Sequence, residues 1–336
     1  MRSSVVLTTL AGLGLLVAGC GAPGSSGTDA STTPSAAETA VELAACEPVA
    51  GDALVVLADD LGLQTVDNIV PAVNAAAVAG DDAILGLLDA VSATLDTPAL
   101  IALNKAVDVD RQTSTVVAQA YLAEQGLDTQ EQVGAGRAVV VGAGNFSESA
   151  TLAELYAGVL DAAGYDASTQ TIGNRETYLP ALQSGELTIV PEYVGTLTEF
   201  LNKGANGADA ESVASADLDA TVAALTGLGE AVGLVFATPA AAQDQNAFAV
   251  TTAFADEHGV TTLSELAATC GGIVLGGPPE CPERTFCQPG LEEVYGLQVG
   301  EFVSLDAGGP LTKSALTGGQ IALGLVFSSD AALAGE

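Results

Sequence analysis

The chain has 336 residues, which at roughly 150 residues per domain corresponds to two domains or to one large bilobal domain. Apolar residues make up 49% of it, enough for sizeable cores, and 8 Lys and Arg against 42 Asp and Glu give a formal charge of −34. This charge argues against binding to nucleic acid and against electrostatic binding to anionic lipid. Since His258 is its one histidine and it has no Trp, the sequence also argues against His-based catalytic triads and multi-His metal sites, and hence against most classes of enzyme.

The first residues have the pattern of an export signal. Arg2 precedes the apolar run Val5–Ala18, which is shorter than the about 20 residues that span a bilayer and has the length of a signal-peptide core. The run ends in the sequence VAGC, in which small residues precede Cys20 as they do at bacterial lipoprotein processing sites. We therefore expect a signal peptide over residues 1–19 and a lipid on Cys20. An ordinary secretory signal with an incidental cysteine is the alternative.

Residues 20–45 are expected to form a flexible tether. The segment Ala22–Thr39 is rich in Gly, Ser, Thr, Pro and Ala and has no apolar periodicity, which is typical of a flexible linker. The folded part of the chain is therefore expected to begin near Cys46.

The cysteines after Cys20 indicate disulfides, because their number is even and the chain is expected to be exported. Four cysteines allow three pairings. Cys281 and Cys287 close a short Pro-containing loop, so we pair them with each other and pair Cys46 with Cys270. A metal site is the alternative, but the spacing is not CxxC and no histidine lies nearby.

The first part of the folded chain contains one strand followed by helices. A strand is expected at Leu54–Leu57 and a turn at Asp59–Gly62. Three helices follow, at about 81–95, 98–107 and 113–124. The polar, Gly-containing segment 128–136 is expected to be a linker.

From Arg137 onward the pattern alternates between strand and helix. Ala138–Val141 is a β-branched run, and after a Gly-Ala-Gly-Asn turn a helix is expected from Ser147 to Gly164. Further strands are expected at 187–190, 234–236, 248–250, 273–275, 302–305 and 321–327, and further helices at 218–229, 262–268 and 311–316. This alternation predicts an α/β architecture with mainly parallel sheets.

Several long segments carry recognisable motifs. Two follow residue 137: VVVGAGNFSESATLAELYAGVLDAAGYD and GNRETYLPALQSGELTIVPEYVGTLTEFL. Two come later, GGPPECPERTFCQPGLEEVYGL and LDAGGPLTKSALTGGQIALGLVFSSDAAL, and two come earlier, VVLADDLGLQTVDNIVPAVN and LIALNKAVDVDRQTSTVVAQAYLAEQGL. All six segments resemble parts of the substrate-binding proteins of osmoprotectant (glycine betaine/choline-type) ABC importers. The first pair resembles the first half of these proteins, the second pair resembles their later part, and the third pair resembles their carboxyl-terminal end. The resemblance implies a two-lobed α/β fold of the type II periplasmic-binding-protein class.

The order of these segments departs from the family, so the resemblance implies a circularly permuted chain. The segment 54–127, which is carboxyl-terminal in the family, comes first here, and the linker 128–136 would join the family's usual termini. The implied organisation has a lobe I at 46–245, which includes the family's amino-terminal part at 137–245, a lobe II at 246–326 and a return crossing to lobe I at 327–336. A truncated tandem duplication is the alternative.

The resemblance also implies which residues bind the ligand. Aromatic rings hold quaternary ammonium groups with roughly 0.5–2 kcal/mol per contact, and a ligand carboxylate needs Arg, hydroxyl or helix N-terminal donors. The matching positions indicate Tyr193, Phe248 and Phe327 as cage aromatics, Thr196 as a ligand contact and Arg284 as a partner of the carboxylate. The alternatives are that Tyr193 and Thr196 simply begin a helix, that both Phe residues belong to the core and that Arg284 is a surface residue.

Two positions depart from the family's pattern, and two further site residues are expected only from their place in the sequence. A family lysine aligns with Gly144, and a further cage aromatic is replaced near Asp67. Asp67 would suit a cation, whose charge it compensates, or a more polar or zwitterionic ligand. Asn145 and Gln245 are expected to be polar wall residues. No dinucleotide cofactor is expected, since the Gly-Ala-Gly turn lacks the third glycine of a dinucleotide fingerprint. No metal ion is expected either, since the sequence has a single histidine.

These features together predict a solute-binding lipoprotein of an ABC importer, on the outer face of the cytoplasmic membrane, and not an enzyme. The protein would bind a small compatible solute such as glycine betaine, choline or carnitine (a quaternary ammonium compound or a zwitterion) by hinge closure, as a monomer, and deliver it to the permease subunits. The alternatives are a receptor for another polar solute, such as an amino acid or an ectoine-like compound, and a ligand-sensing domain for a signalling partner.

Overall fold

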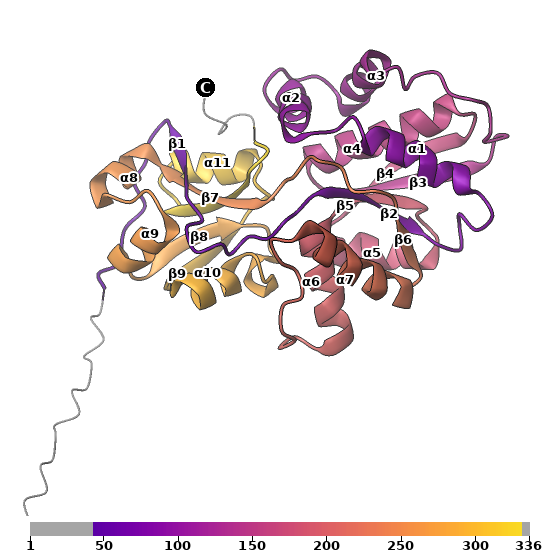
Figure 1. Ribbon diagram of the computed structural model, residues 1–336. Coiled ribbons are helices and arrows are strands. Elements are labelled where there is room, and N and C mark those ends of the chain that lie inside the picture. Colours follow the sequence, from indigo (N-terminus) through magenta and orange to yellow (C-terminus); the bar gives the residue numbers. More distant parts are fainter. Residues whose placement is uncertain (1–42, 331–336) are drawn as a thin grey trace, which may run out of the picture. The chain divides into compact units, whose positions relative to one another are not determined.

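The computed structural model describes residues 43–330. The expected signal peptide, the lipidated Cys20, most of the tether and the last residues of the expected return crossing lie outside the described residues. The strands are β1 (Leu54–Leu57), β2 (Ile69–Asn74), β3 (Ala138–Gly144), β4 (Asp166–Gly173), β5 (Ile189–Tyr193), β6 (Leu234–Phe236), β7 (Asn246–Thr251), β8 (Ile273–Gly277), β9 (Val299–Ser304) and β10 (Leu323–Phe327) (Figure 1). The helices are α1 (Asp82–Ser92), α2 (Thr97–Asp108), α3 (Ser114–Glu124), α4 (Ser147–Ala162), α5 (Arg175–Ser184), α6 (Val194–Asn206), α7 (Leu218–Ala231), α8 (Thr252–His258), α9 (Leu263–Thr269), α10 (Gln288–Tyr295) and α11 (Pro310–Thr317), with a short 3-10 turn η1 (Cys281–Glu283).

The strands form two five-stranded sheets that have the same internal arrangement. In the first sheet the order is β4-β3-β5-β2-β6, and in the second it is β9-β8-β10-β7-β1. The first three strands of each order are parallel to one another, the fourth is antiparallel to the third, and the fifth is antiparallel to the fourth. The structure therefore confirms an α/β fold with two sheets, as expected for the type II periplasmic-binding-protein class.

Helices cover both faces of each sheet. On the first sheet, alternate residues of β2 point to opposite sides, so that Ile69 packs with α1 to α4 and Val70 packs with α5 to α7 (Figure 1). On the second sheet, α8 to α10 pack on one face around Phe248, and α11 packs on the other around Ala249. Within residues 43–330, no single helix has the length and hydrophobicity of a membrane span; α1 and α2 together would, but they are bent by 87°.

The placement of β1 corrects the expected lobe boundaries. Lobe I was expected to begin at residue 46, but β1 pairs with β7 from Leu54 opposite Thr251 to Leu57 opposite Phe248, which places it at the edge of the second sheet. We therefore use lobe I for β2 to β6 with α1 to α7, and lobe II for β1, β7 to β10 and α8 to α11. The described chain crosses between the lobes from β1 to β2 and from β6 to β7.

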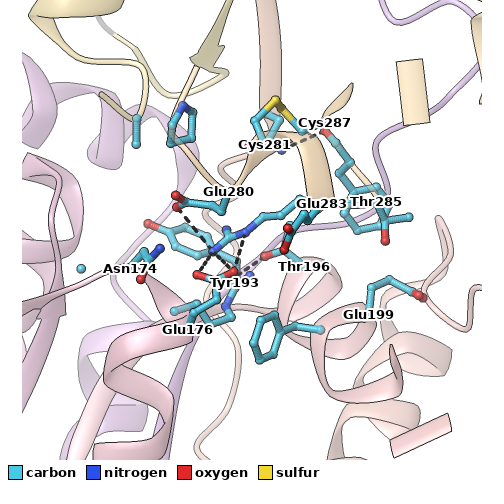
Figure 2. Close-up of a pocket in the computed structure, with 18 of the residues that line it drawn as sticks. Asn174, Glu176, Tyr193, Thr196, Glu199, Glu280, Cys281, Glu283, Thr285 and Cys287 are labelled. Carbon is cyan, nitrogen blue, oxygen red and sulfur yellow. Dashed lines mark hydrogen bonds and ion pairs between the residues drawn. A yellow bond between two sulfur atoms is a disulfide. The ribbon is translucent and has the colours of Figure 1, made fainter. Parts of the chain in front are cut away.

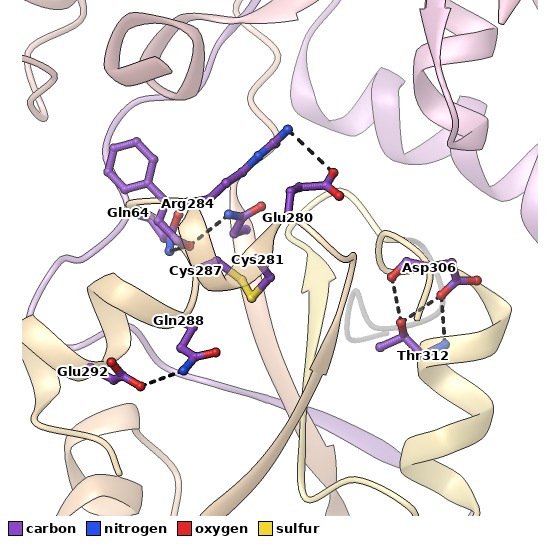
Figure 3. The surroundings of a disulfide bond; sticks show 11 residues. Gln64, Glu280, Cys281, Arg284, Cys287, Gln288, Glu292, Asp306 and Thr312 are labelled. Carbon is purple, nitrogen blue, oxygen red and sulfur yellow. Dashed lines mark hydrogen bonds and ion pairs between the residues drawn. A yellow bond between two sulfur atoms is a disulfide. The ribbon is translucent and has the colours of Figure 1, made fainter. Parts of the chain in front are cut away.

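Both expected disulfides are present, and both lie in lobe II. Cys46 is bonded to Cys270, which directly follows α9, and Cys281 is bonded to Cys287 around η1 (Figure 3). All four cysteines are buried. The first bond fixes the chain ahead of β1 to lobe II, and the second fixes the loop that follows β8.

Candidate functional site

A cavity of about 640 Å³ lies where the parallel strands of both sheets end. From lobe I it is lined by residues at or just after the carboxyl ends of β3, β4 and β5, including Phe146, Arg175 and Tyr193. Tyr193 is labelled in Figure 2. From lobe II it is lined by Glu280, after β8, and by Phe327, at the end of β10. In open α/β sheets ligands bind at the carboxyl ends of the strands, so this cavity is the candidate binding site.

Three aromatic side chains of the cavity, which we call the aromatic trio, lie close together. The ring of Phe146 is 5.6 Å from that of Phe327 and 6.3 Å from that of Tyr193, measured between centroids. Tyr193 is buried, and its hydroxyl donates a 2.6 Å hydrogen bond to Oε1 of Glu148, which fixes the orientation of its ring. Because Phe327 belongs to lobe II and the other two residues to lobe I, the aromatic trio joins the lobes at the cavity.

A buried ion pair supports the lobe I side of the cavity. Nε of Arg175 donates to Oε1 of Glu192 at 2.9 Å, and a terminal nitrogen donates to Oε2 at 2.6 Å. The same nitrogen donates to the hydroxyl of Thr196, and the hydroxyl of Tyr178 donates to Glu192. Burial disfavours a charged guanidinium, yet the Glu192 carboxylate outweighs this effect and raises the pKa of Arg175 above its usual value.

The amino end of α6 is capped by Asp67, which precedes β2. Oδ1 of Asp67 accepts hydrogen bonds from the backbone N–H groups of Gly195, at 2.8 Å, and Thr196, at 3.0 Å. A side chain at position 195 would meet the carbonyl oxygen of Val66 at 2.4 Å, so this close approach requires glycine. Burial raises the pKa of Asp67 to about 7, although the donors at the helix end act in the opposite direction.

Arg284 connects the two lobes through ion pairs. It lies in the Cys281–Cys287 loop of lobe II, and its guanidinium contacts Glu176 of α5 at 2.9 Å and Glu280 at 3.6 Å (Figures 2 and 3). The side chains are partly exposed, so these contacts contribute less than a buried ion pair would. The guanidinium nevertheless forms its ion pairs with carboxylates of the protein itself, those of Glu176 and Glu280.

A second buried network lies behind the aromatic trio. Oε2 of Glu148 accepts 2.6 Å hydrogen bonds from the side chains of Asn104 and Ser329, and the backbone N–H of Ser329 donates to Asp244 at 3.1 Å. Burial raises the pKa of Asp244 well above its usual range, and the neighbouring Glu148 carboxyl adds to this effect. The network thus links α2 and α4 to the β6–β7 crossing and to the residues that follow β10.

The structure brings most of the expected site residues to the cavity but not all of them. Those that line it are Asp67, Asn145, Tyr193, Thr196, Arg284 and Phe327. Phe248, expected as a cage aromatic, is only 1% exposed and belongs to the lobe II core, because its position on β7 faces α8 to α10. Gln245, expected in the wall, instead donates through Nε2 to the carbonyl of Thr65 at 2.6 Å and does not line the cavity.

Several residues of the site were not expected from the sequence. Phe146 directly follows the Gly-Ala-Gly-Asn turn, and an aromatic residue beyond the carboxyl end of a strand was the signal that could have identified it. Glu192 and Glu148 contact cavity-lining side chains, Arg175 and Tyr193 respectively, from behind. No local pattern marks such residues, because their partners lie on other elements.

The variant Asp244→Asn is expected to make stability less dependent on pH. A carboxyl group whose pKa is raised by folding contributes stability at low pH, and this contribution is lost as the pH rises from about 4, the unfolded value, through the folded value. Melting temperatures measured from about pH 4 to pH 8 should therefore fall less steeply in the variant than in the wild type. The exposed Asp52, changed to Asn, is the control. Parallel profiles for Asp244→Asn and wild type would contradict the expectation.

Comparison with known proteins identifies the family. A family described as the substrate-binding domain of ABC-type glycine betaine transport systems matches residues 35–124 and 137–335. A crystal structure described as a glycine betaine/carnitine/choline ABC transporter is similar with 16% identity and a TM-score of 0.36, over 57% of this chain and 68% of that chain. The crystal structure of NikA from Brucella suis in complex with Fe(III)-EDTA is similar with 15% identity and a TM-score of 0.26, over 57% of this chain and 49% of that chain. These TM-scores are too low to carry an argument, so the assignment rests on the family match. The chain belongs to the family of substrate-binding domains of ABC-type glycine betaine transport systems, which are extracytoplasmic solute-binding proteins and not enzymes.

Proposed function

We propose that the protein is the lipid-anchored solute receptor of an ABC importer, which binds a small quaternary ammonium solute such as glycine betaine, choline or carnitine and delivers it to the permease. The observation that carries this proposal is the aromatic trio, whose rings come from both lobes and line one cavity. A methylated ammonium group donates no strong hydrogen bond, but it is attracted to the faces of aromatic rings. Family membership supports the same class of solute.

The structure offers a physical basis for hinge closure. The lobes are joined by the β1–β2 and β6–β7 crossings, and Phe327 and Arg284 of lobe II face lobe I across the cavity. A ligand held by rings from both lobes makes more contacts when the lobes are together. Closure would follow from this difference in binding free energy.

Removal of a ring of the aromatic trio is expected to weaken binding. Phe327→Ala and Phe146→Ala should each raise the dissociation constant of a trimethylammonium solute by about threefold to thirtyfold, since a cation–π contact contributes roughly 0.5–2 kcal/mol. Isothermal titration calorimetry with choline, glycine betaine and carnitine measures the effect.

Phe248→Leu is the matched control, because it removes an aromatic ring from the core outside the cavity. It should lower the melting temperature while changing the affinity less than the two cavity variants do. If none of the three solutes binds the wild-type protein, or if Phe248→Leu weakens binding as much as Phe327→Ala, the proposed function is wrong.

The lipid anchor is part of the proposal and rests on the sequence VAGC, which ends at Cys20, outside the described residues. The variant Cys20→Ser removes the thiol that would carry the lipid. In a bacterial host given a radiolabelled fatty acid, the wild-type protein should be labelled and found with membranes, whereas the variant should be unlabelled. Equal labelling of the two proteins would contradict the anchor.

We further propose that the chain is a circular permutant of its family. Two observations support this proposal: the family match is interrupted at residues 125–136, and this segment forms no helix or strand between α3 and β3. Moreover β1 completes the second sheet in the same position that β6 has in the first, although it comes at the start of the described chain.

A rearranged chain tests the permutation. It begins at Arg137, joins Glu336 to Glu42 through a flexible linker and ends at Leu127, so that it lacks residues 128–136. Because permutation is tolerated where the cut lies in exposed backbone, this chain is expected to fold and to bind the same solute as the wild type. Circular dichroism and calorimetric titration measure both properties. A rearranged chain that does not fold would contradict the proposed order.

A further inference from the structure

The cavity contains more acidic than basic groups, and its basic groups are largely engaged. Its carboxyl groups are those of Asp67, Glu176, Glu199, Asp244, Glu280 and Glu283, whereas its cationic side chains are those of Arg175, Lys203 and Arg284. A solute that bears a carboxylate needs a donor or a cation that is free to bind it. Whether the cavity offers one decides which quaternary ammonium solutes it can hold.

On the lobe I side, Nε and one terminal nitrogen of Arg175 and the N–H groups at the start of α6 already donate to the protein's own carboxylates. Both carboxylate oxygens of Glu192 accept hydrogen bonds from Arg175. The side chain of Arg175 is 5% exposed and that of Glu192 is 0% exposed. The N–H groups of Gly195 and Thr196, which form the anion-binding end of α6, donate to Asp67. Asp67 therefore occupies the place that a ligand carboxylate would take at this helix end.

The guanidinium on the lobe II side is engaged in the same way. Nε and a terminal nitrogen of Arg284 donate to Glu176, and the same terminal nitrogen also lies near Glu280 (Figure 3). A ligand carboxylate at Arg284 would meet a guanidinium whose charge Glu176 already compensates, and to bind its Nε edge it would have to displace that carboxylate. This exchange gains no ion pair and leaves a protein carboxylate without its partner.

Lys203, the remaining cation, lies toward the far end of α6 from the aromatic trio. It is in the last turn of the helix, and at about 1.5 Å per residue its backbone is about 15 Å along the axis from Tyr193. The ammonium and carboxylate groups of glycine betaine are separated by a single methylene. A betaine whose ammonium group contacts Tyr193 would therefore reach Lys203 only where the lysine side chain extends back along the helix.

We propose that the cavity selects a quaternary ammonium cation that lacks a carboxylate, a choline-type alcohol in preference to a betaine, because the protein's own carboxylates already pair with the two arginines and with the helix end that would bind the ligand's carboxylate. This inference rests on the proposed function and narrows its solute class. The aromatic trio would hold the trimethylammonium group, and the acidic lining would favour its net positive charge. Asn145 and Asn246, which also line the cavity, offer uncharged partners to a hydroxyl group.

The test compares choline with glycine betaine, which share the trimethylammonium group and differ in the hydroxymethyl and carboxylate ends. In calorimetric titrations of the full-length protein in detergent micelles, choline is expected to bind at least about tenfold more tightly than glycine betaine. The variant Glu176→Gln releases the closer partner of Arg284. It should therefore reduce the choline preference by about threefold to tenfold, chiefly through tighter binding of glycine betaine.

Glu283→Gln is the matched control, because it removes one carboxylate from the same cavity wall without releasing Arg284. For Glu283→Gln we expect a smaller change in the ratio of the affinity for choline to the affinity for glycine betaine. Asp67→Ala releases the N–H groups of Gly195 and Thr196 and provides a second, independent variant, for which the ratio should also fall. The ratio is the readout because a general change in lobe closure alters both affinities together.

The outcomes separate this inference from the proposed function. If glycine betaine binds the wild type as tightly as choline, the inference is overturned and the proposed function stands. If Glu283→Gln shifts the ratio as much as Glu176→Gln, net charge and not the occupied guanidinium sets the preference, and the inference is again overturned. If no trimethylammonium compound binds, the proposed function itself fails.

Discussion

The buried contact between Arg175 and Glu192 is the interaction on which the site depends. Arg175 begins α5 and Glu192 lies on β5, so the ion pair fixes the end of a central strand against the start of a helix. The same two side chains hold Tyr178 and Thr196, and Glu192 also accepts the backbone N–H of Tyr193. Loss of one partner would leave a buried charge uncompensated, at a cost of about 3–5 kcal/mol. The position of the cavity wall therefore depends on this ion pair as well as on the packing of apolar residues.

Much of the fold could be predicted from the sequence, because its signals are local. The helix after Ser147 and the strands around residues 138–141 and 273–275 follow from apolar periodicity, and the disulfides follow from the short Cys281–Cys287 spacing. Two strands were missed for identifiable reasons. β4 is the exposed, largely polar edge of the first sheet, and β2 contains Pro71, which usually argues against a central strand. Pro71 is tolerated here because it lies opposite Pro191, so that the missing N–H groups fall at one position of the ladder.

The site could be predicted only through the family resemblance. Tyr193 and Phe327 were expected from the positions that they match in the family, and both line the cavity. Phe248 has an equally apolar context, and only the direction in which β7 presents it places it in the core. Arg284 was expected to be free for a ligand. Its partner Glu176 is 108 residues away in the chain, and so the pairing depends on how the lobes meet.

The disulfide between Cys46 and Cys270 also has a mechanical consequence. β1 has only four residues and is the outermost strand of its sheet, so a pull on the chain ahead of it would load its few hydrogen bonds one after another, as in unzipping. Cys46 precedes β1 and is bonded to the chain just after α9. Tension that arrives from the amino-terminal side is therefore carried past the strand by a covalent bond and distributed into lobe II. The receptor can be held by that end without its edge strand being peeled away.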